Sequence, residues 1–221
     1  MGLNLIKWDM TEVGTLIAIL EEIKPSVVIS SLTGNFDAQI AAHEELAKFL
    51  QQTNGRVIFM STANVFDGAP SGGHKATDLP YPISAYGKFK VTCENLLQNA
   101  LGDRCLIIRL PKIQTADFEE FMLKHATEGK PVLANLYMNF CAPEDVAATV
   151  KRAIKAGLSG ILHQGGSKPL SIHEFVSSLG RGVNYTSATL SLEEYCKELG
   201  CDNPNLLKIS DNGNFYLTLI N

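Results

Sequence analysis

Short apolar runs alternate along this chain with amphipathic segments, an arrangement typical of βαβ units. Three runs are apolar almost throughout, as expected of strands that a parallel sheet buries on both faces. They are residues 26–30, 56–60 and 105–110. Amphipathic segments predict helices at residues 11–23, 37–52, 84–100, 116–128, 144–156 and 171–179. Weaker patterns predict short strands at residues 4–8 and 216–220, and a strand leading into a turn at residues 160–166.

This order of elements predicts an α/β fold, a Rossmann-like parallel sheet with flanking helices and right-handed crossovers. We expect residues 1–115 to form its core, and residues 116–221 to form a mixed region with a small C-terminal substrate lobe and a last sheet strand. In open parallel sheets, ligands bind beyond the carboxyl ends of the strands. The site is therefore expected in the segments that follow Ser30, Met60 and Leu110.

Composition narrows the possible partners. The 221 residues are 45% hydrophobic and 19% charged, with a formal net charge of −4 and scattered basic residues, which argues against a nucleic-acid binder. No apolar stretch reaches about 18 residues, so no membrane span is expected. Five cysteines without a C-x-x-C pair or a secretory signal indicate reduced thiols and a cytoplasmic location. His173-Glu174 begins like a zinc-protease motif, but Ser177 stands where the second His is required, so no metal site is expected.

The main candidate for chemistry is the pair Tyr86 and Lys90, at the start of the predicted helix 84–100. Spacing by four residues places both side chains on one face, one turn apart. A phenol titrates near about 10, and a neighbouring ammonium favours the phenolate, so such a Tyr can act as an acid or base near neutral pH. Because Tyr and Lys at this spacing also form ordinary surface pairs, the pair alone is weak evidence.

Two neighbouring segments strengthen this interpretation. Residues 60–68, with the sequence M-S-T-A-N-V-F-D-G, begin at the end of the strand 56–60. Thr62 therefore offers a hydroxyl that can polarise a carbonyl which Tyr86 protonates, although it can also simply cap the end of its strand. Residues 78–86, D-L-P-Y-P-I-S-A-Y, form a proline-rich approach to the helix.

The run S-T-A-N-V-F-D-G followed by D-x-P-x-P-x-S-x-Y-G-x-x-K resembles the extended short-chain dehydrogenase/reductases, especially the dTDP-4-dehydrorhamnose reductase branch. The likeness continues through Ile108-Arg109-Leu110-Pro111, residues 142–147 and residues 160–172. These motifs occur in the family's order and spacing, and together they cover roughly residues 9–180.

The resemblance implies an NAD(P)H-dependent reductase, or an epimerase, of a nucleotide-activated keto sugar. Tyr86 would protonate the substrate carbonyl as hydride arrives, Lys90 would lower the pKa of Tyr86 and bind the nicotinamide ribose, and Thr62 would hold the carbonyl oxygen. Contacts with the cofactor, NADP or NAD, are further expected from Leu32, Arg109 and Pro111, and contacts with the substrate from Asn64 and His74. Two of these residues have equal alternatives, since Arg109 can meet a substrate phosphate or pair with a carboxylate, and His74 can be a surface side chain.

The chain also departs from the family's pattern. The 221 residues contain no G-x-x-G-x-x-G run, the turn whose following helix receives the pyrophosphate. The resemblance therefore implies an N-terminally truncated core in which strand 26–30 becomes an edge. We expect either that residues 4–8 pair with that edge or that two chains form a homodimer there. The family's relay Asn falls in residues 39–43, which contain none. Two functions stay open, a reductase impaired in dinucleotide binding and a non-catalytic nucleotide-sugar-binding or regulatory subunit.

Overall fold

The computed structural model describes most of the chain. The described residues are 5–12, 14–69, 73–180, 186–189, 194 and 197, together with the backbone of 215–219. At its centre lies a four-stranded parallel sheet in the order β1-β2-β4-β8. These strands are β1 (Val27–Ser30), β2 (Arg56–Thr62), β4 (Cys105–Leu110) and β8 (Gly160–His163). The predicted α/β class and the three apolar strands are confirmed.

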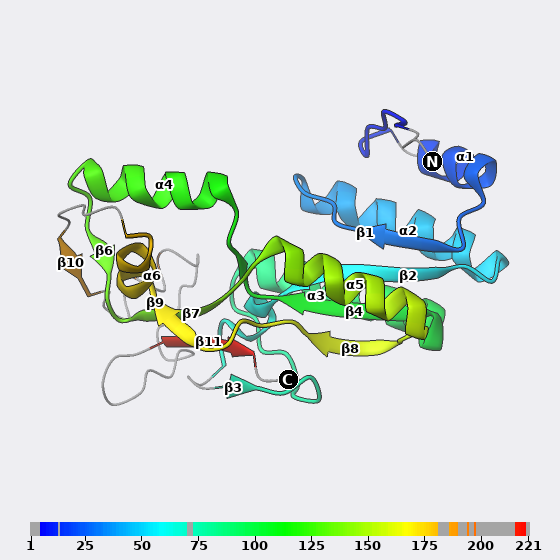
Figure 1. Ribbon diagram of the computed structural model, residues 1–221. Helices are drawn as coiled ribbons and strands as arrows, with labels where there is room; N and C mark the ends of the chain where they lie inside the picture. The colour runs from blue at the N-terminus through cyan, green and yellow to red at the C-terminus, as the bar shows by residue number, and fades with distance from the viewer. Residues whose placement is uncertain are drawn as a thin grey trace.

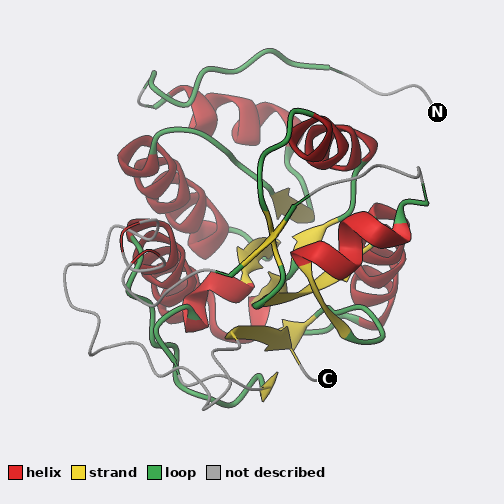
Figure 2. Cartoon of the chain, turned by 90° about the vertical axis from the view of Figure 1, so that its left-hand side faces the viewer, coloured by secondary structure: helices red, strands yellow, loops and turns green. Residues whose placement is uncertain are grey.

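Helices cover both faces of this sheet, because successive side chains of a strand point to opposite faces. The helices are α2 (Phe36–Gln52), α3 (Ala85–Leu101) and α5 (Pro143–Ala156), with α1 (Thr15–Ile23) outside α2. Phe59 and Ile107, neighbours across β2 and β4, belong to the core that α2 and α3 close. Ile58 and Ile108 point the other way, into the smaller core under α5. Figure 2 shows these helices on both sides of the strands.

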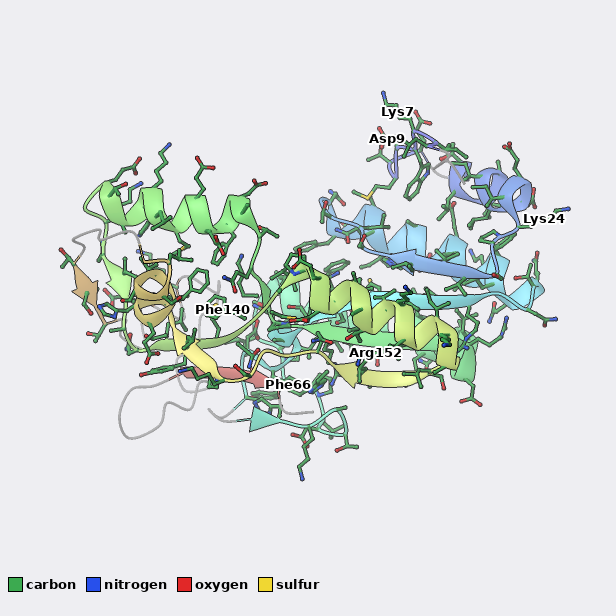
Figure 3. All side chains as sticks on the ribbon, in the orientation of Figure 1. Lys7, Asp9, Lys24, Phe66, Phe140 and Arg152 are labelled. Carbon is green, nitrogen blue, oxygen red and sulfur yellow. The ribbon has the colours of Figure 1, made fainter. Side chains whose placement is uncertain are left out.

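A second sheet lies beyond the carboxyl ends of the parallel strands (Figure 1). Its strands run in the order β3-β11-β7-β5, and β9 pairs antiparallel with β7. They are β3 (Gly73–His74), β11 (Phe215–Leu219), β7 (Leu136–Cys141), β5 (Lys112–Ile113) and β9 (Pro169–Ser171). The helices α4 (Ala116–Thr127) and α6 (Ile172–Ser178) pack against it, and β6 (Val132–Leu133) pairs with β10 (Ser187–Ala188). Phe140, labelled in Figure 3, stacks on Phe175 at 4.2 Å between ring centroids in this second core.

The N-terminal segment differs from the prediction. Residues 5–8 form no strand, and among the described residues β1 pairs only with β2, so the expectation that residues 4–8 cover this edge is wrong. The backbone turns instead, since the Asp9 carboxylate accepts a hydrogen bond from the Thr11 N–H at 2.9 Å. The helix expected at 11–23 begins only at Thr15, because Gly14 has the left-handed φ of 84°.

β1 is an edge strand within the described part of the chain, and its Ile29 is 48% exposed. Pairing of two chains at this edge stays a prediction.

The region after residue 115 contributes to both sheets. Helix α5 and strand β8 return to the first sheet, whereas the predicted last strand, seen at 215–219, joins the second. None of the helices in the described part of the chain has the length and apolar composition needed to cross a membrane.

The zinc-protease-like pair on α6 has a local structural role. The Glu174 carboxylate accepts from the Ser171 N–H at 2.7 Å, and the Ser171 hydroxyl accepts from the Glu174 N–H at 3.0 Å. This is the predicted capping box at the helix start. Glu174 therefore stabilises the N-terminus of α6.

Candidate active site

The start of α3 is fixed by side chains of the segment before it. The Ser84 hydroxyl accepts from the Gly87 N–H at 3.0 Å and donates to the Asp67 carboxylate. The same carboxylate accepts from the Ile83 N–H at 2.7 Å. Burial raises the pKa of Asp67, and its hydrogen bonds with Ser84 and Ile83 act in the opposite direction. Because Asp67 directly follows η1 (Ala63–Phe66), the motif that ends β2 also fixes where α3 begins.

Gly87 allows α3 to approach η1 closely. A Cβ at this position would lie 2.4 Å from the Asn64 carbonyl oxygen and 2.9 Å from the Pro82 Cβ. We therefore expect Gly87→Ala to lower the free energy of unfolding by about 1–3 kcal/mol through overpacking, as measured by urea denaturation. Lys88→Ala, on the exposed side of the same turn, is the control and should change stability by less than about 0.5 kcal/mol. Equal losses in the two variants would contradict this account.

Two hydroxyls meet where β2 ends and α3 begins. The Thr62 hydroxyl accepts from the Asn64 N–H and donates to the Asn64 side-chain oxygen, both at 3.2 Å. Thr62 and Tyr86 line the same cavity. Tyr86 is 40% exposed, so its phenol is accessible from the cavity beside it. This arrangement places the Thr62 hydroxyl and the Tyr86 phenol beside the same small cavity.

Lys90 lies behind Tyr86 and outside that volume. Its Nζ donates to the Met60 carbonyl oxygen at 3.0 Å and lies 5.8 Å from the centroid of the Tyr86 ring. Burial lowers the pKa of Lys90, and the neighbouring Cys93 and Glu94 act to raise it. One turn of α3 thus separates the two groups, as their spacing predicts.

The pKa of Tyr86 differs in direction from the expectation. Burial raises it above the ordinary value of 10.0, and the neighbouring Thr62 hydroxyl acts to lower it. The expected lowering by Lys90 is therefore wrong for the chain in this structure, because desolvation is the largest influence on the phenol. A raised pKa keeps Tyr86 protonated near neutral pH, the form that an acid needs.

A cavity of about 340 Å³ opens beside these groups. Its lining residues are Thr62, Ala63, Asn64, Tyr86, Pro111, Lys112, Ile113, Met138 and Asn139. Four predicted site residues are therefore brought together, namely Thr62, Asn64, Tyr86 and Pro111. The sequence interpretation missed the others: Lys112 and Ile113 directly follow Pro111, a signal that was available, whereas β7 with Met138 and Asn139 carries no clear alternation.

Four predicted site residues lie outside this cavity, namely Lys90, described above, and Leu32, Arg109 and His74. Leu32 is half-buried in the loop after β1. Arg109 is 1% exposed and makes two hydrogen bonds to Glu94, from Nε at 3.1 Å and from Nη2 at 2.8 Å. Of its two alternatives, the structure shows the pair with a carboxylate. His74 stacks on Phe66, labelled in Figure 3, at 4.4 Å between ring centroids.

Two polar side chains of α2 occupy the segment where the resemblance places a relay Asn. His43 is buried, with Nε2 at 2.8 Å from the Ser30 hydroxyl oxygen and Nδ1 at 2.6 Å from the Gln39 carbonyl oxygen. Burial lowers the pKa of His43 to about 4, so the ring is neutral near pH 7. Gln39 is equally buried and donates from Nε2 to the Gly34 carbonyl oxygen at 3.0 Å.

A second cavity, of about 550 Å³, adjoins the first, and Lys112 and Met138 line both. Its other lining residues are Phe118, Met122, His125, Lys130, Pro131, Val132, Leu133, Ile172, Ala188, Thr189 and Glu194. The Lys112 amine lies 4.1 Å from the centroid of the Phe118 ring. The pKa of Lys112 is lowered by burial. The combined space thus runs from two hydroxyls to a largely apolar chamber whose lining also includes Lys112, Lys130 and Glu194.

Known proteins are similar to this chain over different shares of its length. The family model described as RmlD substrate binding domain matches residues 1–193. A dTDP-4-dehydrorhamnose reductase of Aggregatibacter actinomycetemcomitans is 27% identical over 121 residues, 49% of this chain and 41% of that protein. The beta subunit of methionine adenosyltransferase 2 of Xenopus laevis is 26% identical over 201 residues, 78% of this chain and 59% of that protein. The chain thus spans less than two thirds of the length of either relative.

The fold is shared with solved structures. A crystal structure of the dTDP-4-dehydrorhamnose reductase of Bacillus anthracis in complex with NADP superposes with a TM-score of 0.72. It is 20% identical, and the match covers 83% of this chain and 72% of that one.

Proposed function

The chain belongs to the RmlD substrate binding domain family, and we propose that it carries the carbonyl-protonating site of an NAD(P)H-dependent reductase of a nucleotide-activated keto sugar. The observation that carries this proposal is the cavity in which Tyr86 and Thr62 meet. A carbonyl oxygen placed there would accept a proton from the Tyr86 phenol and a hydrogen bond from the Thr62 hydroxyl, in place of the one that this hydroxyl donates to Asn64. The nicotinamide, when bound, supplies the hydride to the carbonyl carbon, and the product is an alcohol.

The described residues fit one end of such a cofactor. Tyr86 and Pro111 border the cavity on the side of the parallel strands, where a nicotinamide and its ribose would lie against the phenol. Lys90 has one amine hydrogen bond, to the Met60 carbonyl oxygen, and its remaining two donors suit ribose hydroxyls. Within the described ranges no glycine-rich turn opens a helix toward a pyrophosphate. We therefore assign this chain's own residues to the nicotinamide end alone.

The second cavity suits the nucleotide of the substrate. Lys112 stands between the two cavities, where its ammonium would meet phosphates that join a sugar beside Tyr86 to a base beyond. Phe118 and Met122 supply apolar surface in that chamber, and Lys130 supplies further positive charge. A nucleotide-sugar fits this sequence of surfaces, because its charge lies between two less charged ends.

Calorimetric titration with dTDP tests the nucleotide site. We expect Lys112→Ala to weaken binding about tenfold, since loss of one charged contact costs roughly 1.5 kcal/mol or more. Lys124→Ala is the matched control, because Lys124 is an exposed cation of α4 that lines neither cavity. Unchanged dTDP affinity in Lys112→Ala, or equal losses in both variants, would contradict this placement.

A second candidate is a non-catalytic nucleotide-sugar-binding or regulatory subunit. The observation that favours it is the likeness over 78% of the chain to a protein named as a subunit of methionine adenosyltransferase. Oxidation of NADPH in the presence of a dTDP-4-keto sugar separates the two candidates. Turnover supports the reductase. Binding of dTDP, with neither turnover nor binding of NADPH, supports the subunit.

A further inference from the structure

Three consecutive residues at the end of β2 face successive turns of α3. Lys90 donates to the Met60 carbonyl oxygen, the Ser61 hydroxyl donates to Glu94, and Thr62 lines the same cavity as Tyr86. The three α3 residues are spaced by four, so they form one row along the helix. Tyr86 and Lys90 in this row are proposed site residues, and Glu94 is at the buried end of the row.

Glu94 is unusually well fixed for a carboxylate. Its Oε1 accepts from the Ser61 hydroxyl and from Arg109 Nε, and its Oε2 accepts from Arg109 Nη2 at 2.8 Å. The two side chains are 3% and 1% exposed. A two-point contact between a guanidinium and a carboxylate fixes orientation as well as distance. Glu94 therefore has little freedom to move relative to β4, which carries Arg109.

Arg109 is itself held from two other directions. Its guanidinium lies 5.1 Å from the centroid of the Phe66 ring, and its Nη1 lies 3.4 Å from His163 Nε2. Burial lowers the pKa of His163 to about 4, so the ring is neutral near pH 7. With Nδ1 donating to the His74 carbonyl oxygen at 3.1 Å, Nε2 is left as an acceptor for Arg109. The network thus joins β4, β8 and β3 to the inner face of α3.

We infer that Glu94 is a positioning residue: held by Arg109, it binds Ser61 and fixes the end of β2 against α3, so that Tyr86 stays beside Thr62. The inference rests on the proposed function, because the placement of Tyr86 matters only if Tyr86 acts as an acid. The placement itself can be tested without turnover, because it changes the surroundings of the Tyr86 phenol. Glu94 touches neither cavity, and so it acts only through Ser61 and the helix.

If the hydrogen bond between Ser61 and Glu94 were purely structural, its loss would lower stability and leave the titration of the Tyr86 phenol unchanged. This difference provides the test. Ser61→Ala removes the bond to Glu94 and keeps the pair with Arg109. We expect the pKa of Tyr86 to fall toward 10.0, because burial, its largest influence, is relaxed when α3 loosens. The measurement is the pH titration of tyrosinate absorbance, taken as the difference between each variant and the same variant with Tyr86→Phe. Lys90, the titratable neighbour of the phenol, is present throughout.

Thr149→Val is the matched control. It removes another largely buried hydroxyl that donates to a side chain, Gln164 Oε1 at 2.5 Å, from α5 on the opposite face of the sheet. We expect similar losses of stability in both variants and a changed Tyr86 titration only in Ser61→Ala. An unchanged Tyr86 titration in Ser61→Ala, or the same change in Thr149→Val, overturns the inference.

If Ser61→Ala does not fold, Ser61→Cys takes its place, since a thiol keeps most of the volume and is a weaker donor. The phenol titration is read without cofactor or substrate. Its result therefore stands whether or not the chain reduces a sugar, and failure of the proposed function is recognised separately by the absence of turnover.

Discussion

Tyr86→Phe is expected to lower kcat for reduction of a dTDP-4-keto sugar by NADPH about 10²- to 10⁴-fold, the usual contribution of a positioned acid. The phenol is the acidic group that lines the cavity together with Thr62, and its raised pKa keeps it protonated. The Kd of dTDP should not change, because the second cavity is lined without Tyr86. Steady-state kinetics together with calorimetry therefore separate loss of the acid from loss of binding.

Tyr81→Phe is the control for that substitution. Tyr81 is 47% exposed and precedes the same helix, but it lines neither cavity. Its backbone N–H, which the substitution keeps, donates to the Val65 carbonyl oxygen at 2.8 Å. Comparable losses of kcat in both variants would sink the assignment of Tyr86 as the acid, and so would full activity in Tyr86→Phe.

The main sheet could be predicted from the sequence because its strands are apolar on both faces. Residues 105–110 run apolar almost without a break, and β4 has those bounds in the structure. The second sheet could not, because its strands β3 and β5 are two residues long, too short to show a periodic pattern. Such strands exist through long-range pairing, as between Leu219 of β11 and His74. Residues 5–8 show the opposite error, an apolar pattern without a neighbouring strand to pair with.

Some residues of the candidate site could be predicted from the sequence, and others could not. Thr62, Asn64, Tyr86 and Pro111 stand in motifs, and the structure gathers them around one cavity. Asn139 reaches that cavity only because β7 pairs with β5, with Phe140 opposite Lys112, a relation between distant segments that no local pattern contains. The partner of Lys90 is a backbone carbonyl oxygen, and main-chain acceptors leave no trace in the residue types. The choice between the two alternatives for Arg109 likewise depended on where α3 packs.

The free energy of unfolding is expected to fall by about 3–5 kcal/mol in Glu94→Gln, because the substitution leaves the Arg109 charge buried without its counter-charge. Arg109 is 1% exposed, so water does not solvate the guanidinium where it lies. The nearby His163 offers only a neutral acceptor at 3.4 Å. Urea denaturation at pH 7 measures the loss, and an unchanged slope with denaturant would show that the native state remains compact.

A double substitution distinguishes loss of the counter-charge from loss of packing. In Glu94→Met/Arg109→Met both charges are removed, and apolar side chains of similar length fill the space between α3 and β4. Replacing a buried ion pair in this way is often neutral or stabilising, so most of the loss in Glu94→Gln should be recovered. A double variant that is less stable than Glu94→Gln would mean that the pair itself stabilises this core. In that case, the charge network under the helix would contribute to the stability of the fold in addition to the placement of Tyr86.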